Sequence, residues 1–430
     1  MPASRSSVAC SEFIQTRSSS RPKIEFTELT TDGPESGRPG TSIFILLDDM
    51  PFVVDSLRQC MNRMGASIRH LNNAVLNVER GKSSGKGGRQ LRSLASADEN
   101  GYKREALSCI HCAPLSEDKR KELEKEIRET LKLVSAAVKD YVPMLKQVQQ
   151  IRQSLLDSQN NLPVDTAVLD ESVEFIDWIV DNHFTFLGYE CYRIRQRSKG
   201  QVMEFQEDSV LGVSRYNKDI KKTASIDSLP EGTREIILDP QICSFAKSSQ
   251  RSKIHRPAYY DYILIKEFDE NGEVAVEHRF KGLYTSSVYY RTALDIPLVR
   301  KKVKTVLDRS GFAANGHSLK DLMQVINVFP RDELFQMNTA QLFSTAMEIT
   351  QIQETRTSKL FVRRDSYGKF FSCLVYVPRD IYSTRVRYKI QNFLKERLNA
   401  TELEYNIYLS ESILARVHIV LRVPDIQNVK

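Results

Sequence analysis

The spacing of apolar residues changes at one short junction near the N-terminus. Residues 43–47 form an unbroken apolar run, which is typical of a strand buried on both faces. Beyond the junction, apolar residues recur at steps of three and four, which predicts an amphipathic helix that ends at Gly65. The apolar positions of this helix are Phe52 or Val53, Leu57, Cys60, Met61 and Met64.

The pattern that follows predicts a small α+β unit. Residues 74–80 and 105–113 have strand character, and a long helix is expected from Ser116 towards Asp157, divided near Pro143. The segment 81–101 between the two strands is rich in Gly, Ser and Lys, so we expect a mobile insertion there. The resulting order is the core of a ferredoxin-like βαββαβ unit that lacks a clear final strand.

Two later regions have a similar texture. Residues 165–356 predict an apolar helix, a strand, a hairpin at 260–280 and several further helices. Residues 357–430 predict the order strand, strand, helix, strand, strand, with Gly368 in the first turn. We therefore expect an α+β fold of several ferredoxin-like units, with antiparallel sheets and helical linkers.

Composition adds domain boundaries. The first 40 residues are rich in Ser and Arg and poor in acidic residues, and without an apolar secretion segment they are expected to be a disordered leader. The expected domains are then residues 41–157 with the insertion 81–101, residues 165–356, and residues 357–430. A chain of 430 residues is long enough for roughly two to four domains.

Charge and cysteine content narrow the class of protein. The net charge of +7 comes from 62 basic and 55 acidic residues mixed along the chain, which favours a solvated surface over nucleic-acid binding. Seven scattered cysteines suit reduced thiols in a cytoplasmic protein. No apolar stretch approaches the roughly 18 to 20 residues that a membrane span needs, so no membrane partner is expected.

A search for chemistry predicts no catalytic residue, no metal site and no cofactor bound by this chain. Neither a GxGxxG motif after a strand nor a P-loop is present in the sequence. Cys109 and Cys112 form a lone C-x-x-C, but residues three apart on a strand face opposite sides. The basic segment 247–256 suits either a phosphate or carboxylate ligand or, more simply, a solvated loop.

The junction itself is the strongest candidate site, formed by Asp48, Asp49, Pro51 and Phe52. Pro51 suits the first turn of a helix, where its missing N–H is not needed. The N–H groups just beyond it have no partner within the helix, so an acidic ligand is one candidate for them. The alternative, which the sequence favours, is that the carboxylate of Asp48 or Asp49 caps these donors.

The residues of this junction and of the helix after it resemble a known type of domain. An apolar strand, Asp49-Met50-Pro51 and a helix ending in Gly resemble the opening of ACT-type amino-acid-sensing domains. Further blocks, in order along the chain, resemble the N-terminal part of the large NAD-dependent glutamate dehydrogenases of bacteria. The blocks are residues 48–65, 183–192, 255–274, 278–290, 296–312, 329–336 and 360–380.

The resemblance implies a place within a longer enzyme. Members of that family carry ACT-like domains in their N-terminal third and a dehydrogenase core downstream, and they convert L-glutamate, NAD and water to 2-oxoglutarate, ammonia and NADH. It implies that this chain is a regulatory and assembly region of three ACT-like units without that core. It also implies that this chain binds no NAD, which the full-length enzyme uses. Its implied partners are the downstream catalytic domain, the other subunits of a homo-oligomer and an amino-acid effector.

One departure from the ACT pattern concerns Phe52. Sensor domains have Gly directly after Asp-x-Pro, which lets a ligand approach the helix N-terminus closely. Phe52 at this position argues against a ligand there and for a packing or interdomain role. A freestanding amino-acid-binding module is the alternative function, and nucleic-acid binding is a weaker third.

Overall fold

The computed structural model describes residues 5–17, 21–29, 39–81, 89–95, 102–198, 200–217, 220, 222–365, 367–409 and 412–424. They form two compact units, Met1–Lys139 with Ser252–Ala258, and Asp140–Arg251 with Tyr259–Lys430. The fold is α+β with three antiparallel sheets, as the sequence predicts. No helix in the described ranges is long and apolar enough to cross a membrane.

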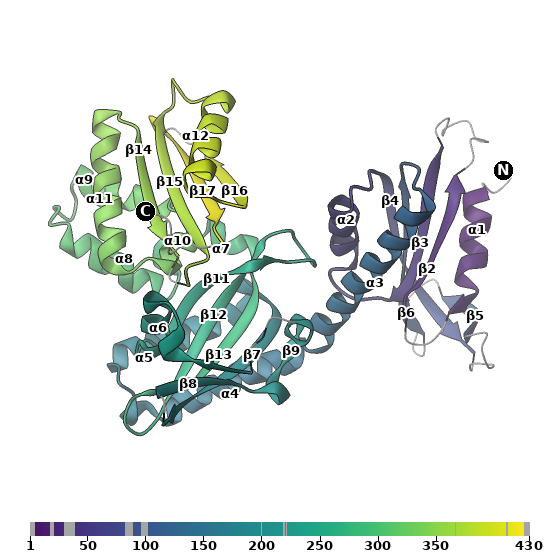
Figure 1. Ribbon diagram of the computed structural model, residues 1–430, viewed down its shortest axis with the longest axis horizontal. Helices are drawn as coiled ribbons and strands as arrows, with labels where there is room; N and C mark the ends of the chain where they lie inside the picture. The colour runs from purple at the N-terminus through teal and green to yellow at the C-terminus, as the bar shows by residue number, and fades with distance from the viewer. Residues whose placement is uncertain are drawn as a thin grey trace. The chain divides into compact units, whose positions relative to one another are not determined.

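The first unit has a six-stranded sheet of order β1-β5-β4-β6-β3-β2. Figure 1 shows helices α2 and α3 on one face of this sheet and α1 on the other. The strands are β1 (Thr16–Arg17), β2 (Lys23–Leu29), β3 (Gly40–Asp48), β4 (Ile68–Arg80), β5 (Arg89–Ala95) and β6 (Lys103–Cys112). The helices are α1 (Arg5–Ile14), α2 (Val53–Arg63) and α3 (Glu117–Lys139).

The missing final strand of the predicted βαββαβ unit is supplied from the N-terminal side. Strand β2 pairs antiparallel with β3, in the position that the last strand of such a unit would take. The expectation of a disordered leader over 1–40 is therefore wrong for α1, β1 and β2. Composition misled because the ordering is tertiary: β2 forms a ladder with β3, and Phe13 packs on Phe44 with ring centroids 5.7 Å apart.

The expected insertion at 81–101 also contains a strand. Residues 89–95 form β5, which pairs with both β4 and β1, so the expectation of a mobile segment is wrong for them. Residues 82–88 and 96–101 lie outside the described residues. The long helix divides at Asp140, and its second part, α4 (Tyr141–Asp157), belongs to the second unit rather than to a domain ending at 157.

The second unit begins with a seven-stranded antiparallel sheet of order β10-β8-β7-β13-β12-β11, with β9 paired to β7. Neighbouring strands are joined mainly by hairpins, so the sheet does not have the βαββαβ order expected for residues 165–356. Its strands are β7 (Phe184–Arg197), β8 (Gly200–Phe205), β9 (Leu211–Gly212), β10 (Thr223–Ser225), β11 (Cys243–Arg251), β12 (Tyr259–Phe268) and β13 (Val274–Tyr284).

Helices surround this sheet and share one large core with it. Buried side chains from α4, α5, the sheet and the helices after β13 form a single apolar cluster. The helices are α5 (Thr166–Trp178), α6 (Glu231–Leu238), α7 (Ser286–Tyr290), α8 (Val299–Arg309), α9 (His317–Asn327), α10 (Arg331–Gln336) and α11 (Thr339–Thr355). The helical segments expected in this region are thus present.

The last region has the predicted order strand, strand, helix, strand, strand. Its elements are β14 (Lys359–Arg364), β15 (Phe370–Pro378), α12 (Thr384–Arg397), β16 (Glu402–Tyr408) and β17 (Leu414–Arg422). The sheet order β14-β15-β17-β16 matches that of β2-β3-β6-β4 in the first unit, strand for strand. Both sheets therefore place a strand that precedes the ferredoxin-like core in the position of its last strand.

Candidate functional site

The four candidate residues form the turn between β3 and α2. Asp48 ends β3, and Phe52 is the N-cap residue of α2. Asp49 is held by Arg104, because its N–H donates to the Arg104 carbonyl at 3.1 Å and its Oδ2 lies 3.0 Å from Nη2 of Arg104. Pro51 is exposed. The turn thus depends on strand β6 as well as on its own sequence.

The aspartates do not cap α2, contrary to the sequence-based expectation. The N-cap residue is Phe52, whose side chain makes no capping hydrogen bond and whose backbone is left-handed, with φ 70° and ψ −2°. Asp48 accepts instead from Arg17 on β1, and Asp49 pairs with Arg104 on β6. A guanidinium group carries a full positive charge, whereas a helix N–H is only a dipole, so the carboxylates pair with the arginines.

Phe52 packs against residues 252–258, which belong to the same compact unit as the turn. The centroids of the Phe52 and His255 rings lie 4.9 Å apart. The N–H of His255 donates to Oγ of Ser56 at 3.0 Å, and Nε2 of Gln59 donates to the Ser252 carbonyl. The side of α2 that carries Ser56 and Gln59 is therefore covered by the protein's own loop.

The basic segment 247–256 is neither a solvated loop nor an open anion site over its charged positions. Nζ of Lys247 lies 2.7 Å from Asp261, Nη1 of Arg251 lies 2.7 Å from Glu404, and Nζ of Lys253 lies 3.0 Å from Glu126. Asp261 lies opposite Lys247 across the β11–β12 pair, and Glu404 and Glu126 are distant in the sequence, so the spacing within the segment gave no sign of these partners.

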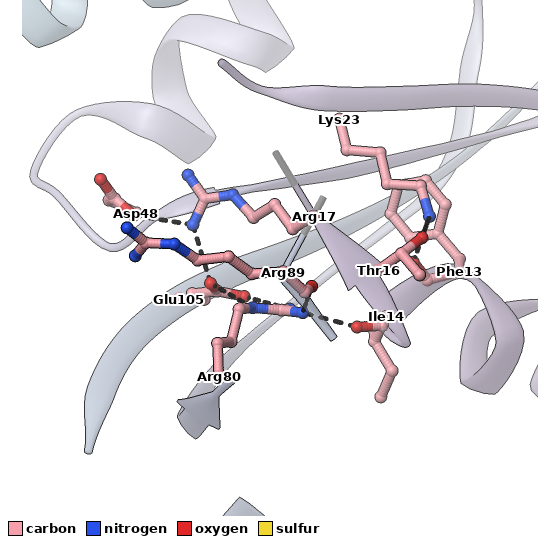
Figure 2. Close-up of polar contacts among 9 residues, drawn as sticks. All are labelled: Phe13, Ile14, Thr16, Arg17, Lys23, Asp48, Arg80, Arg89 and Glu105. Atoms are coloured by element: carbon pink, nitrogen blue, oxygen red, sulfur yellow. Dashed lines mark hydrogen bonds and ion pairs between the residues drawn. The ribbon is translucent and has the colours of Figure 1, made fainter. Parts of the chain in front are cut away.

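A second cluster of charges lies beside Asp48 (Figure 2). Nη1 of Arg17 donates to Oδ1 of Asp48 at 2.7 Å and to Oε1 of Glu105 at 2.9 Å. Arg80 also binds Glu105, through Nε at 2.8 Å and through Nη2 at 2.6 Å. Glu105 is buried, with 3% of its surface exposed, so one carboxylate holds two guanidinium groups away from water.

Strand register brings this cluster together. Asp48 on β3 lies directly opposite Glu105 on β6, and Arg17 on β1 lies directly opposite Arg89 on β5. Cross-strand partners point to the same face of a sheet. The sequence did not reveal this cluster, because Arg17 fell in the expected leader and Arg89 in the expected insertion. Their separation along the chain, 72 positions, leaves no local pattern to find.

The second unit contains a polar pocket lined by ten residues of β11, α10 and the last sheet. They are Lys247, Asp332, Glu333, Gln336, Arg363, Asp365, Phe370, Ser372, His418 and Val420. Arg363 binds Glu333 through two hydrogen bonds of 2.7 Å each. Burial alone would raise the pKa of Glu333, but the charge and hydrogen bonds of Arg363 lower that pKa to about 2.

The pocket does not form a nucleophile–base–acid triad. Oγ of Ser372 lies 2.8 Å from Nε2 of His418, as a nucleophile and its base would. The carboxylate of Glu333 approaches the same ring nitrogen, at 3.9 Å, whereas a triad acid must bind the other one. Burial lowers the pKa of His418, so the imidazole is a neutral structural partner of Ser372.

The described side chains and strands suit neither a metal ion nor a dinucleotide. Among the described residues, no group of three or more His, Cys, Asp or Glu side chains converges as metal ligands would. A nicotinamide dinucleotide usually binds at the end of a parallel βαβ unit. Every described strand pair is antiparallel, so the residues present do not fit that cofactor.

Three family models match the chain in order. The model described as glutamate dehydrogenase, ACT1 domain, matches residues 5–127. The model of glutamate dehydrogenase, helical motif 1, matches residues 296–355, which hold α8 to α11. The model of glutamate dehydrogenase, ACT2 domain, matches residues 359–430. The ACT1 match includes α1 and β2, in agreement with their place in the first sheet.

Three relatives that match most of this chain are each named NAD-specific glutamate dehydrogenase. The NAD-specific glutamate dehydrogenase of Halomonas elongata is 39% identical over 419 residues, which cover 95% of this chain and 25% of the relative. That of Pseudomonas aeruginosa is 41% identical over 393 residues, covering 89% and 23%. That of Mycobacterium tuberculosis is 25% identical over 389 residues, covering 90% and 22%. The chain thus spans about a quarter of the length of these relatives.

One solved structure aligns with this chain at a low TM-score. The periplasmic sensory domain of the Campylobacter jejuni chemoreceptor Tlp1 aligns with 68% of this chain and 95% of that chain, at 12% identity and a TM-score of 0.17. The fold and the matched models together define a region that contains ACT domains of the glutamate dehydrogenase type. The chain belongs to the family of large NAD-dependent glutamate dehydrogenases, as its N-terminal region.

Proposed function

We propose that this chain is the regulatory and assembly region of a longer, cytoplasmic NAD-dependent glutamate dehydrogenase. In this proposal the longer enzyme converts L-glutamate, NAD and water to 2-oxoglutarate, ammonia and NADH, with a catalytic core outside this chain. The observation that carries it is the ordered series of ACT1, helical motif 1 and ACT2 in a chain that spans 23–25% of the Halomonas elongata and Pseudomonas aeruginosa relatives.

The polar groups of the chain support a role other than catalysis. The described charged clusters pair acids with bases internally, as Glu105 with Arg17 and Arg80, and Glu333 with Arg363. Such pairs fix the geometry of a fold and leave few groups poised for proton transfer. NAD is accordingly proposed to bind to the core of the longer enzyme.

The corner at Phe52 supports an interdomain or packing role over a ligand site. A sensor ligand would approach the N-terminus of α2, and that side is occupied by the ring of Phe52 and the loop that contains His255. An amino-acid effector, if the longer enzyme responds to one, is therefore proposed to bind away from this corner. A freestanding amino-acid-binding module would need the corner open, so the closed corner disfavours that alternative.

Exposed apolar side chains support the assembly part of the proposal. More than half of the exposed large apolar side chains among the described residues lie after residue 359. Val362 on the edge strand β14 is 50% exposed and Phe393 on α12 is 64% exposed. Contiguous exposed apolar patches mark protein–protein contacts. We propose that the exposed apolar side chains of residues 360–413 form such a surface, and that a second copy of the chain, as part of a homo-oligomer, contacts it.

Sedimentation velocity over a range of protein concentrations tests the assembly role. The chain is expected to self-associate, and Val362→Lys is expected to shift it to the monomer by placing a charge in the contact. Val142→Lys is the matched control, because Val142 is 58% exposed and lies on α4. A chain that stays monomeric at every concentration, or equal effects of both lysines, would contradict this part of the proposal.

Calorimetry separates the regulatory region from the freestanding module. Amino acids, including glutamate and aspartate, are titrated into the chain and into Phe52→Gly, which removes the ring that covers the corner. The proposal expects no binding at the corner in the unaltered chain. Tight binding that is lost on substitution of residues 48–52 would favour the freestanding module, as would a coding sequence with no dehydrogenase core downstream.

A further inference from the structure

Arg17 and Arg89 are direct cross-strand partners in the first unit. They face each other across the antiparallel pair of β1 and β5, and Figure 2 shows both side chains directed towards Asp48. Like charges directly opposite each other on one face of a sheet are destabilising. This pair therefore needs negative charge nearby.

The acidic side chains beside the pair are already engaged. Glu105 accepts hydrogen bonds from Arg17 and from a third arginine, Arg80, whose Nη2 lies 2.6 Å from Oε2 of Glu105. Asp48 accepts from Arg17, but its side chain is 65% exposed, so water screens its charge. Three guanidinium groups thus face two carboxylates, of which one is buried. Within the part of the chain that the structure describes, the side chain of Arg89 has no ion-pair partner.

One hydrogen-bond donor of Arg17 has no partner among the described residues. Its side chain is 6% exposed, its Nη1 makes both bonds to the carboxylates, and its Nε is buried without a hydrogen-bond partner among the described residues. A buried donor without a partner is rare, and an ion or water that satisfies it is a usual explanation.

We propose that Arg17 and Arg89 bind a small oxyanion, a carboxylate or phosphate group, at the open side of this cluster. A guanidinium group presents N–H donors in a planar fork that matches the oxygen atoms of either group. The anion supplies the negative charge that the cross-strand pair lacks. Asp48 competes for Arg17, so this aspartate sets how tightly the anion binds. A regulatory meaning for the site rests on the proposed function; the binding itself does not.

Titration of the full 430-residue chain tests the site with two probes, inorganic phosphate and acetate. Binding is measured by calorimetry, and the protection of β1 and β5 by hydrogen–deuterium exchange, each against sodium chloride of equal ionic strength. One probe or both is expected to bind and to protect these strands. Phosphate alone would assign a phosphate-bearing ligand, and acetate alone would assign a carboxylate-bearing ligand.

Three variants locate the site. Arg89→Met is expected to weaken binding by about ten-fold or more, as for the loss of a charge-assisted hydrogen bond. Arg92→Met is the matched control, because Arg92 lies on the same strand, is 62% exposed and pairs with Glu79 instead. Asp48→Asn is expected to tighten binding by releasing Arg17. Arg89 is half-buried and has no ion-pair partner among the described residues, so its replacement should leave the fold intact.

The inference is overturned by either of two results. The first is that neither probe does more than sodium chloride. The second is that Arg89→Met and Arg92→Met weaken binding equally, which would indicate only general attraction to a basic chain. Neither result would touch the family assignment, because no enzymatic readout enters the experiment.

Discussion

The ring of Phe52 packs against the imidazole of His255, with centroids 4.9 Å apart and planes tilted by 52°. Phe52 also has a φ of 70°, a left-handed conformation that favours glycine. The corner thus keeps the backbone of a glycine turn while its side chain closes the approach to α2. This relationship reconciles the ACT-like Asp-x-Pro sequence with the absence of glycine after it.

Replacing Phe52 should separate these two effects. Phe52→Ala removes the ring contact and keeps the unfavourable φ, so it is expected to lower the stability of the first unit by about 1–2 kcal/mol. Phe52→Gly also removes the ring but relaxes the backbone, so it is expected to be less destabilising than Ala by about 1 kcal/mol. Hydrogen–deuterium exchange of α2 measures the difference. An Ala variant as stable as the Gly variant would show that the left-handed turn does not form.

The buried pair of Glu333 and Arg363 should stabilise the second unit strongly. Both side chains are less than 10% exposed, so Glu333→Gln leaves a buried guanidinium group without its carboxylate and is expected to cost about 3–5 kcal/mol. Urea unfolding followed by the fluorescence of Trp178, the single tryptophan, measures this cost.

The exposed pair of Glu348 and Lys359 is the control for this experiment. Both side chains are more than 40% exposed, so Glu348→Gln should cost less than about 1 kcal/mol. Equal costs for the two substitutions would mean that the Glu333–Arg363 pair is open to water.

The stability of the second unit should depend on pH through Glu333. Its pKa is about 2 in the folded chain, below its ordinary value of 4.5. Its contribution is therefore present above about pH 4.5 and is lost as the pH falls towards 2. In urea unfolding across this window, the slope of the unfolding free energy against pH is expected to be steeper than that of Glu333→Gln, by up to about 1.4 kcal/mol per pH unit. Parallel slopes would contradict the low pKa.

The cysteine thiols should react slowly in the native chain. Burial raises the pKa of Cys109 to about 11 and the pKa values of Cys243 and Cys373 to about 12, so almost none of these groups are thiolates near neutral pH. A disulfide reagent is expected to modify these three thiols only after unfolding in urea, when all seven cysteines react. Rapid native modification of both Cys109 and Cys112 would instead indicate an accessible dithiol.

The sequence was sufficient for elements with strong periodicity. The apolar run at 43–47 and the helix after Pro51 are β3 and α2, and the strand, strand, helix, strand, strand order of the last region is present. In each case the local pattern and the tertiary environment favour the same structure, as when Leu57 and Cys60 on one helical face are both buried.

Other features depended on contacts that no local pattern encodes. Strand β2 is ordered by its ladder with β3, and Arg17 meets Arg89 only because β1 and β5 pair in one register. The expected capping by Asp48 failed because Arg17 lies close enough to take that carboxylate. These partners are distant in the sequence. The sequence therefore indicated the corner as a candidate site, but not the side chains that meet beside it.

We propose that the catalytic core lies outside this chain, and an assay of turnover tests this most directly. Purified chain is mixed with L-glutamate and NAD, and NADH formation is followed by absorbance, with the Pseudomonas aeruginosa relative as the positive control. We expect no NADH above the protein-free blank at any concentration of the chain. NADH formation in proportion to the amount of chain would contradict it.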